Sequence, residues 1–313
     1  MDNSTLPKNA ATAEAQAPEA PHQHSTPMKI TLPALQEKKR SRTPIAALTA
    51  YDFASARVVD EAGMDLVLVG DSLAMVMLGY ESTLPVTVDE MLLFTRAVRR
   101  GVRRAVLVAD MPFGSYHASV AEGVANAVRF LKEAGAEAVK IEGGRSRVDM
   151  VHALVEAEIP VVGHIGLTPQ SVHRMGGYRV QGKSFTAAEH LLEDARALEA
   201  AGISLLVLEG IPRELAAQIT AELQVPTIGI GAGPECDGQI LVLHDLLGLT
   251  FAPPAKFVRS YADLGGQMRA AVQQYGEDVA ARRFPGDVES YHLPIETRSQ
   301  MEQSLLSRRQ KKA

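Results

Sequence analysis

The chain has 313 residues and a formal net charge of −5, and its Lys and Arg residues are scattered, so its charge gives no support to a nucleic-acid partner. Hydrophobic residues make up 46% and charged residues 22%, and no apolar run reaches the roughly 18 to 20 residues of a membrane span. The single cysteine, Cys236, cannot form an internal disulfide, which indicates a reducing, cytoplasmic setting. We therefore expect one enzyme domain that acts on a small molecule, with neither a nucleic acid nor a membrane as partner.

The two ends of the chain are predicted to be disordered tails. Residues 1–27 are rich in Ala, Pro, Thr, Gln and His, show no periodicity and lack the apolar core of a signal peptide. His22 and His24 could bind a metal, but a solvated tail is favoured because no third ligand lies nearby. From about Leu293 the chain is polar and ends in basic residues, so residues 293–313 are interpreted as a C-terminal tail. A single folded domain over residues 28–292 remains.

Within this domain, apolar segments alternate with longer amphipathic ones, a pattern typical of βα units around a parallel sheet. The apolar segments predict strands that are covered on both faces, and residues 120–134 and 187–201 between them show helical spacing. The eight predicted strands are 45–50, 65–70, 105–109, 136–141, 160–164, 204–208, 227–230 and 239–244. A doubly wound sheet would alternate in the same way. Eight units with polar residues at the C-terminal ends of most strands favour closure into a (β/α)8 TIM barrel.

Four acidic residues stand at the ends of separate predicted strands, in the strings LVLVGDS, VLVADMP, AVKIEGG and LLVLEGIP. They are Asp71, Asp110, Glu142 and Glu209. The C-terminal ends of barrel strands share one mouth, so these carboxylates are expected to converge there. Carboxylates at short range cannot all stay ionised without a compensating cation or proton, which favours a hard divalent cation. One acidic residue after a strand often only caps the next helix, but four at one rim favour metal binding or acid-base chemistry.

Two further polar residues are predicted to lie on the same rim. Lys140 comes two residues before Glu142, so strand alternation directs both side chains into the barrel. A buried lysine needs a partner, and Lys140 is predicted either to pair with Glu142 or to bind a substrate anion. His164 ends the fifth predicted strand, where a site residue and a hydrogen-bonded core histidine are both open interpretations.

Seven motifs occur in this order along the chain: LTAYD, VGDSLAMVMLGYEST, ADMPFGSY, VKIEGG, GHIGLTPQSV, LEGIP and GIGAGPECDGQ. In order and spacing they resemble the ketopantoate hydroxymethyltransferase family, over about Met28 to Tyr291. The resemblance implies a magnesium-dependent (β/α)8 barrel of pantothenate and coenzyme A biosynthesis. Such an enzyme transfers a hydroxymethyl (one-carbon) unit from 5,10-methylenetetrahydrofolate to 3-methyl-2-oxobutanoate, which gives 2-dehydropantoate (ketopantoate). The resemblance also implies a homo-oligomer, a decamer.

The resemblance further implies roles for particular residues. Asp71 and Asp110 match direct metal ligands, with Glu142 nearby and acting through water. The positions that match keto-acid contacts are Asp71, Ser72, Asp110, Lys140 and His164. Glu209 matches the proton acceptor. These residue types suit the reaction, because magnesium prefers oxygen ligands and a cation on the keto oxygen stabilises the enolate that forms on proton removal.

Two other functions remain as alternatives. A related magnesium-dependent 2-keto-acid carbon-carbon lyase or phosphonate-forming barrel would use the same cation, but it typically relies on a cysteine in a short loop. Cys236 lies elsewhere, after the seventh predicted strand. A noncatalytic barrel that senses a keto acid would keep Asp71 and Asp110 but would have no need for Glu209.

Overall fold

The computed structural model describes residues 28–310 of the chain. Its eight parallel strands pair in chain order, and β8 returns to β1 to close the barrel, which confirms the predicted (β/α)8 architecture. The strands are β1 (Ile45–Thr49), β2 (Leu66–Val69), β3 (Val106–Asp110), β4 (Ala138–Glu142), β5 (Val161–Gly166), β6 (Leu205–Glu209), β7 (Thr227–Ile230) and β8 (Gly238–Leu241). All eight predicted strands are present, with ends shifted by at most three residues.

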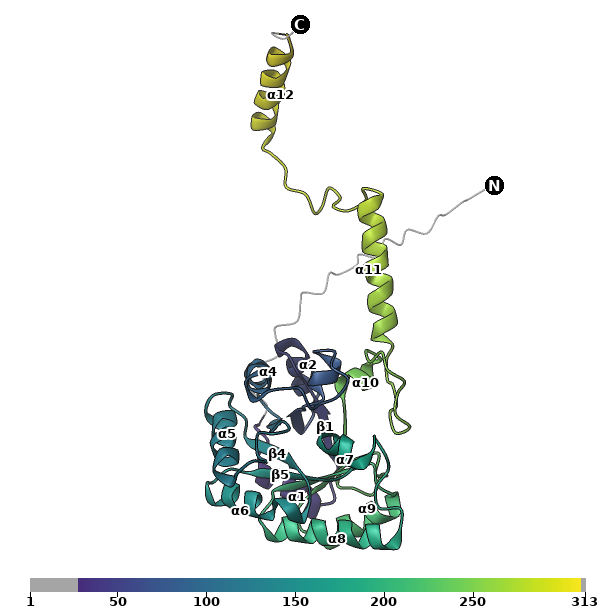
Figure 1. The fold of residues 1–313 in the computed structure, drawn as a ribbon. Helices are drawn as coiled ribbons and strands as arrows, with labels where there is room; N and C mark the ends of the chain where they lie inside the picture. Colours follow the sequence, from purple (N-terminus) through teal and green to yellow (C-terminus); the bar gives the residue numbers. More distant parts are fainter. Residues whose placement is uncertain (1–27, 311–313) are drawn as a thin grey trace, which may run out of the picture.

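Helices surround the barrel and connect most of the strands (Figure 1). They are α1 (Leu32–Arg40), α2 (Phe53–Glu61), α3 (Leu73–Val76), α4 (Val88–Gly101), α5 (Val120–Lys132), α6 (Val148–Glu156), α7 (Val172–Met175), α8 (Phe185–Ala200), α9 (Arg213–Glu222), α10 (Leu243–Leu247), α11 (Leu264–Ala280) and α12 (Ile295–Gln310). Two short 3-10 turns, η1 (Arg145–Arg147) and η2 (Pro169–Ser171), follow β4 and β5. Helices α5 and α8 confirm the two segments predicted from their helical spacing.

The fourth helix shows why these segments become helices at these positions. Thr87 caps α4 by accepting from Glu90 N, and the Glu90 side chain accepts from Thr87 N, so two otherwise unpaired amide groups are satisfied. Met91, Leu92 and Val98 recur at helical spacing and are buried. The cap therefore sets where the helix begins, and the apolar stripe sets which face packs against the sheet.

The sheet separates two apolar layers. Alternate strand residues such as Leu66, Val106 and Leu205 fill the barrel interior, and their neighbours pack outward against the helices. Leu35 of α1 is fully buried in the interior layer, so α1 closes the end of the barrel where the strands begin. The opposite end, where the strands finish, is the mouth at which the predicted polar residues gather.

The regular repeat changes after β7. Residues 231–237 join β7 directly to β8, and β8 ends at Leu241. The apolar pattern placed His244 in the last strand, but the structure places it in α10. Leu243 N donates to Thr49 Oγ1 (2.9 Å), so the start of α10 is bonded to the end of β1.

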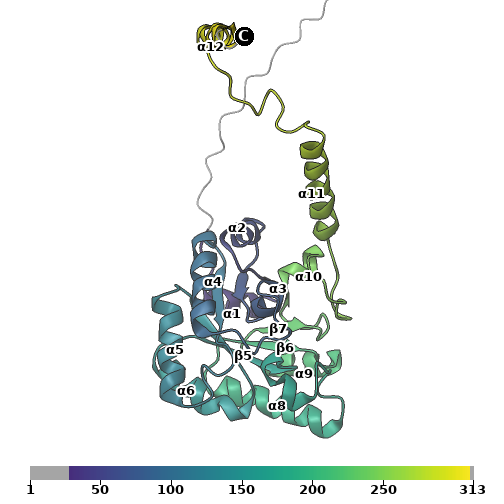
Figure 2. The same cartoon turned by 45° about the horizontal axis from the view of Figure 1, so that its top comes forward.

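The last two helices, α11 and α12, project away from the barrel (Figures 1 and 2). None of the residues in either helix is buried, so α11 does not pack on the sheet as the helix of an eighth unit would. The structure also differs from the expected disorder of the C-terminal tail, because Ile295–Gln310 is helical. Its residues include good helix formers and an i,i+4 pair, Arg298–Glu302 (3.1 Å).

The predicted N-terminal tail, with His22 and His24, lies outside the described residues, as do residues 311–313. Over residues 28–310, no helix has both the length and the apolar character needed to cross a membrane.

Candidate active site

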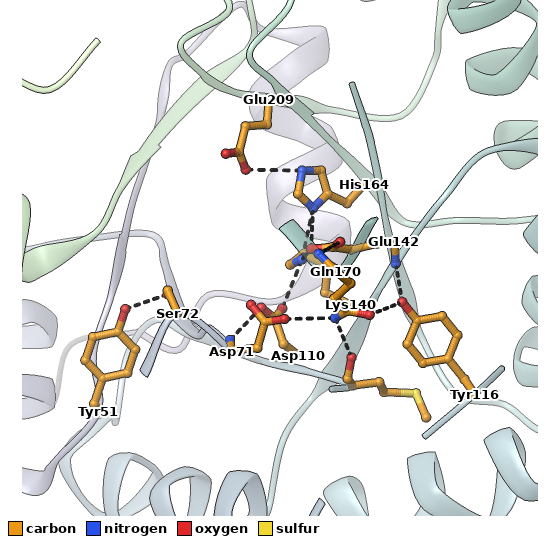
Figure 3. A network of polar contacts seen from close by, with 11 residues as sticks. Tyr51, Asp71, Ser72, Asp110, Tyr116, Lys140, Glu142, His164, Gln170 and Glu209 are labelled. Atoms are coloured by element: carbon orange, nitrogen blue, oxygen red, sulfur yellow. Dashed lines mark hydrogen bonds and ion pairs between the residues drawn. The ribbon is translucent and has the colours of Figure 1, made fainter. Parts of the chain in front are cut away.

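Strand register brings the predicted polar residues to one rim of the barrel. Asp110, the last residue of β3, pairs with Lys140 of β4. Glu142, the last residue of β4, pairs with His164 of β5. All four side chains are buried, and Lys140 and Glu142 lie on the same side of β4, as strand alternation predicted. Neighbouring strands therefore build the centre of the site (Figure 3).

The turn after β2 adds Asp71 and Ser72 to this centre. Asp71 N donates to Asp110 Oδ2 (2.9 Å), so Asp71 is held beside the carboxylate of Asp110. Ser72 Oγ lies 2.8 Å from the hydroxyl of Tyr51, a buried residue that follows β1. Polar residues that follow β1 and β2 thus lie next to the end of β3 (Figure 3).

Lys140 is the main positive charge in the centre. Its Nζ lies 3.3 Å from Asp110 Oδ1 and 3.5 Å from Glu142 Oε1. Burial lowers the pKa of Lys140, but the charges of Asp110, Glu142 and Asp71 outweigh it and raise this pKa above its usual value. The ammonium is therefore held charged. It pairs with two carboxylates, Asp110 and Glu142.

In their ionised forms, Asp71 and Asp110 carry more negative charge than the single ammonium of Lys140 can offset. Burial raises the pKa of Asp71 well above its usual value, and the charges of Asp110 and Glu142 raise it further. Burial likewise raises the pKa of Asp110, although Lys140 opposes this shift. A cation bound between these carboxylates would stabilise their ionised forms.

Glu142 differs from the two aspartates in its surroundings. Burial alone would raise the pKa of Glu142, but Lys140 and His164 lower it below its usual value. Its Oε2 accepts from Gln170 N (2.9 Å). Glu142 is therefore ionised near neutral pH, with one oxygen bonded to the backbone and the other facing Lys140.

His164 lies between two carboxylates. Its Nδ1 is 3.3 Å from Glu142 Oε1, and its Nε2 is 3.3 Å from Glu209 Oε2. Lys140 Nζ also lies 3.1 Å from Nδ1. Burial and Lys140 lower the pKa of His164, but the two carboxylates prevail and raise it to about 9. His164 therefore links Glu209 to the centre instead of packing as an isolated core histidine.

Glu209 stands at the edge of this centre. It is the last residue of β6, and its side chain is 16% exposed, compared with 3% for Glu142. In Figure 3 it lies across His164 from the Asp71 and Asp110 pair. Glu209 is therefore the rim carboxylate that is reachable from the mouth and separate from the two aspartates.

Buried oxygen atoms without hydrogen-bond partners test whether the site fits a metal ion. Among the described residues, Asp110 Oδ1 and Glu142 Oε1 have no such partner, which is uncommon for buried polar atoms. No group of three or more His, Cys, Asp or Glu side chains in residues 28–310 is arranged to hold a metal. Magnesium often uses only one or two protein carboxylates and keeps several waters. The open oxygens and the excess negative charge therefore fit magnesium, without a preformed three-ligand cage.

Three site residues escaped the sequence prediction: Tyr51, Tyr116 and Gln170. Each lies inside a quoted motif, in LTAYD, ADMPFGSY and GHIGLTPQSV respectively, and each follows a strand that ends at the mouth. Gln170 Nε2 donates to Asp71 Oδ2 (2.9 Å), and Tyr116 OH accepts from Glu142 N (3.0 Å). A search for uncharged polar residues just beyond each strand would have found them.

Cys236 lies away from this rim. It is buried near Thr220 and Thr227, at the end of the barrel where the strands begin, and burial raises the pKa of its thiol. Thr227 is the first residue of β7. The cysteine is thus not placed to act on a ligand in the mouth, which disfavours the lyase alternative.

A closed (β/α)8 barrel with a buried acid-base cluster at the C-terminal mouth defines a class, the TIM-barrel enzymes. The family model for ketopantoate hydroxymethyltransferase matches residues 29–287, and the chain belongs to this family. This result confirms the resemblance seen in the seven motifs. The chain is accordingly an enzyme of the transferase class.

Close relatives agree with this placement. The chain is 63% identical to the 3-methyl-2-oxobutanoate hydroxymethyltransferase of Koribacter versatilis, over 88% of this chain and 93% of that one. It is 58% identical to the enzyme of the same name from Gloeobacter violaceus, over 81% of this chain and 98% of that one. The crystal structure of 2,3-dimethylmalate lyase has a TM-score of 0.54 and 20% identity, over 91% of this chain and 99% of that one. This last similarity shows a shared fold alone.

Proposed function

We propose that the protein transfers a hydroxymethyl unit from 5,10-methylenetetrahydrofolate to 3-methyl-2-oxobutanoate, with magnesium as its metal, and so forms ketopantoate. The observation that carries this proposal is the separation of two kinds of carboxylate at one rim. Asp71 and Asp110 are deeply buried and linked to each other, and Glu209 is partly exposed on the far side of His164 (Figure 3). Proton removal from a keto acid needs both kinds of carboxylate, because one must hold the cation and the other must accept the proton.

Asp71 and Asp110 would hold the magnesium directly, and Glu142 would act through water. When bound, the ion supplies a Lewis acid that stabilises negative charge developing on the keto oxygen. Lys140 and Ser72 would hold the substrate carboxylate, and His164 would form a further contact. Lys140 suits this role because it is buried, charged and held between Asp110 and Glu142.

Glu209 would accept the proton from C3 of the keto acid. His164 Nε2 lies 3.3 Å from Glu209 Oε2 and would help to hold this carboxylate in place. The C3 carbon would then form a bond to the methylene carbon of the folate, tetrahydrofolate would leave, and water would supply the oxygen of the new hydroxyl group. Exclusion of other water by the barrel mouth would protect the reactive carbanion.

A product assay tests this function. Purified protein, magnesium, 3-methyl-2-oxobutanoate and methylenetetrahydrofolate are mixed, and ketopantoate is measured by mass spectrometry. We expect ketopantoate only when magnesium and the folate are both present. Cleavage of a larger 2-keto acid without folate would instead support the lyase, and keto-acid binding without any product would support the noncatalytic sensor.

We also propose a homo-oligomer in a cytoplasmic setting, with a decamer as the expected size from the family resemblance. The exposed side chains of Met268, Val272, Tyr275 and Val279 support association, because they recur on one face of α11. Light scattering coupled to size-exclusion chromatography measures the mass. A monomer of about 34 kDa, from the 33.6 kDa chain, would contradict this part of the proposal.

A further inference from the structure

Gln170 connects two of the carboxylates in the active site. It lies in η2 after β5 and is only 5% exposed. Its Nε2 donates to Asp71 Oδ2 (2.9 Å) and to Met111 O (3.0 Å), and its backbone N donates to Glu142 Oε2 (2.9 Å). One residue therefore binds one oxygen of Asp71 and one oxygen of Glu142.

Tyr116 fixes the orientation of the Gln170 amide. Tyr116 OH donates to Gln170 Oε1 (2.7 Å), and it accepts from Glu142 N (3.0 Å). Because Gln170 Oε1 accepts this bond, Nε2 must be the atom that faces Asp71. Tyr116, Gln170 and Glu142 thus form a closed ring of hydrogen bonds on one side of the site (Figure 3).

Hydrogen bonds from Gln170 and from the backbone of Asp71 determine which carboxylate oxygens remain available. Asp71 Oδ2 and Glu142 Oε2 are bonded to Gln170, and Asp110 Oδ2 is bonded to Asp71 N. Among the described carboxylates, the buried oxygens that remain open are Asp110 Oδ1 and Glu142 Oε1, and both face Lys140. In each carboxylate one oxygen is held by a donor, so the other is presented in a defined direction.

We propose that Gln170, held by Tyr116, is a positioning residue that presents Asp71 and Glu142 to the magnesium and the keto acid. This inference rests on the proposed function for its ligands. A glutamine suits the position because it donates to Asp71 while it accepts from Tyr116. A carboxylate there would lack the donor and would add negative charge to a site that already has an excess.

Metal affinity tests the inference without relying on turnover. Mn²⁺ replaces Mg²⁺ as the probe, and electron paramagnetic resonance measures free Mn²⁺ during a titration of the full chain with the keto acid present. Gln170→Met keeps the length of the side chain and removes its donor, so we expect Mn²⁺ affinity to fall at least about tenfold. Tyr116→Phe keeps the donor to Asp71 but frees the amide, and we expect a loss of about threefold.

Asp60→Asn is the matched control, because Asp60 is also buried and hydrogen-bonded but lies at the other end of the barrel. It should lower the thermal midpoint and leave Mn²⁺ affinity unchanged. Wild-type Mn²⁺ affinity in Gln170→Met would overturn the inference and leave the proposed function intact. If Gln170→Met does not fold, Tyr116→Phe becomes the deciding variant, and an unchanged Mn²⁺ affinity in it would overturn the inference. Absence of Mn²⁺ binding in the wild type would instead overturn the metal assignment, and this inference with it.

Discussion

The two ends of the barrel both bury carboxylates, but they satisfy them differently. At the end where the strands begin, Asp60 accepts backbone N–H groups from Arg103, Arg104 and Ala105 at distances of 2.7 to 3.0 Å. At the mouth, Asp110 Oδ1 is buried without a hydrogen-bond partner among the described residues. The first arrangement holds loops together, and the second leaves binding capacity for a ligand.

The same contrast holds for the other acids at the closed end. Asp65 Oδ2 accepts from Ala46 N (3.0 Å) and from Lys38 (2.7 Å). Asp237 Oδ2 accepts from Thr227 N (2.8 Å) and from Lys39 (2.7 Å). Backbone amides and lysines from α1 thus neutralise each charge locally. A buried carboxylate oxygen that is left open has capacity to bind a ligand, whereas a carboxylate that is fully bonded within the protein stabilises the fold.

The largest expected effect comes from removing a carboxylate at the mouth. Asp110→Ala should lower kcat/KM by about 10³-fold or more, because a bound metal contributes several kcal/mol to such a reaction. Isothermal titration should show weak magnesium and keto-acid binding in a protein with an unchanged circular dichroism spectrum. Wild-type affinity in folded Asp110→Ala would show that this open oxygen does not mark a metal site.

A second change separates proton removal from binding at the same mouth. Glu209→Gln keeps the shape of the side chain and removes its basicity, so exchange of the C3 proton should slow roughly 10²-fold or more. Magnesium and keto-acid binding should be retained, because Glu209 lies across His164 from the two aspartates. Incubation of the keto acid in heavy water measures the exchange. Exchange at the wild-type rate would exclude Glu209 as the base and make His164 the first candidate.

At the closed end, the expected effect is on stability. Asp60→Asn leaves its three backbone donors with weaker or missing acceptors, which should cost about 1 to 3 kcal/mol of unfolding free energy. Its kcat and KM should stay close to wild type, because it has no contact with the mouth. Thermal denaturation checks the loss of stability, and steady-state kinetics on the same preparation check that kcat and KM are unchanged. A large loss of kcat without a lower midpoint would break the comparison between the two ends.

The smallest effect is expected outside both ends of the barrel. A chain shortened to residues 28–292 should fold and turn over like the full chain, because none of the residues of α12 is buried. The thermal midpoint should change by less than about 5 °C, on the order of 1 kcal/mol for a domain of this size. A larger drop in the midpoint would show that a terminal segment contributes packing energy.

The polar centre was only partly predictable. Asp110, Lys140 and Glu142 could be placed because each ends a strand whose apolar pattern is local, and parallel strands in a barrel share a mouth. Gln170 escaped prediction because an uncharged residue beyond a strand has no distinctive pattern, and its partner Asp71 lies 99 residues away in the chain. Contacts of this range depend on the closure of the whole sheet.

Sequence alone determined the eight strands, their order and the residues at their ends, since periodicity and strand ends are properties of short segments. Tertiary structure alone decided which atoms are left without partners. The open oxygens of Asp110 and Glu142, the link through His164 to Glu209 and the projection of α11 all follow from how distant segments pack. A hydrogen bond needs a partner in three dimensions, and no local pattern states where that partner will be.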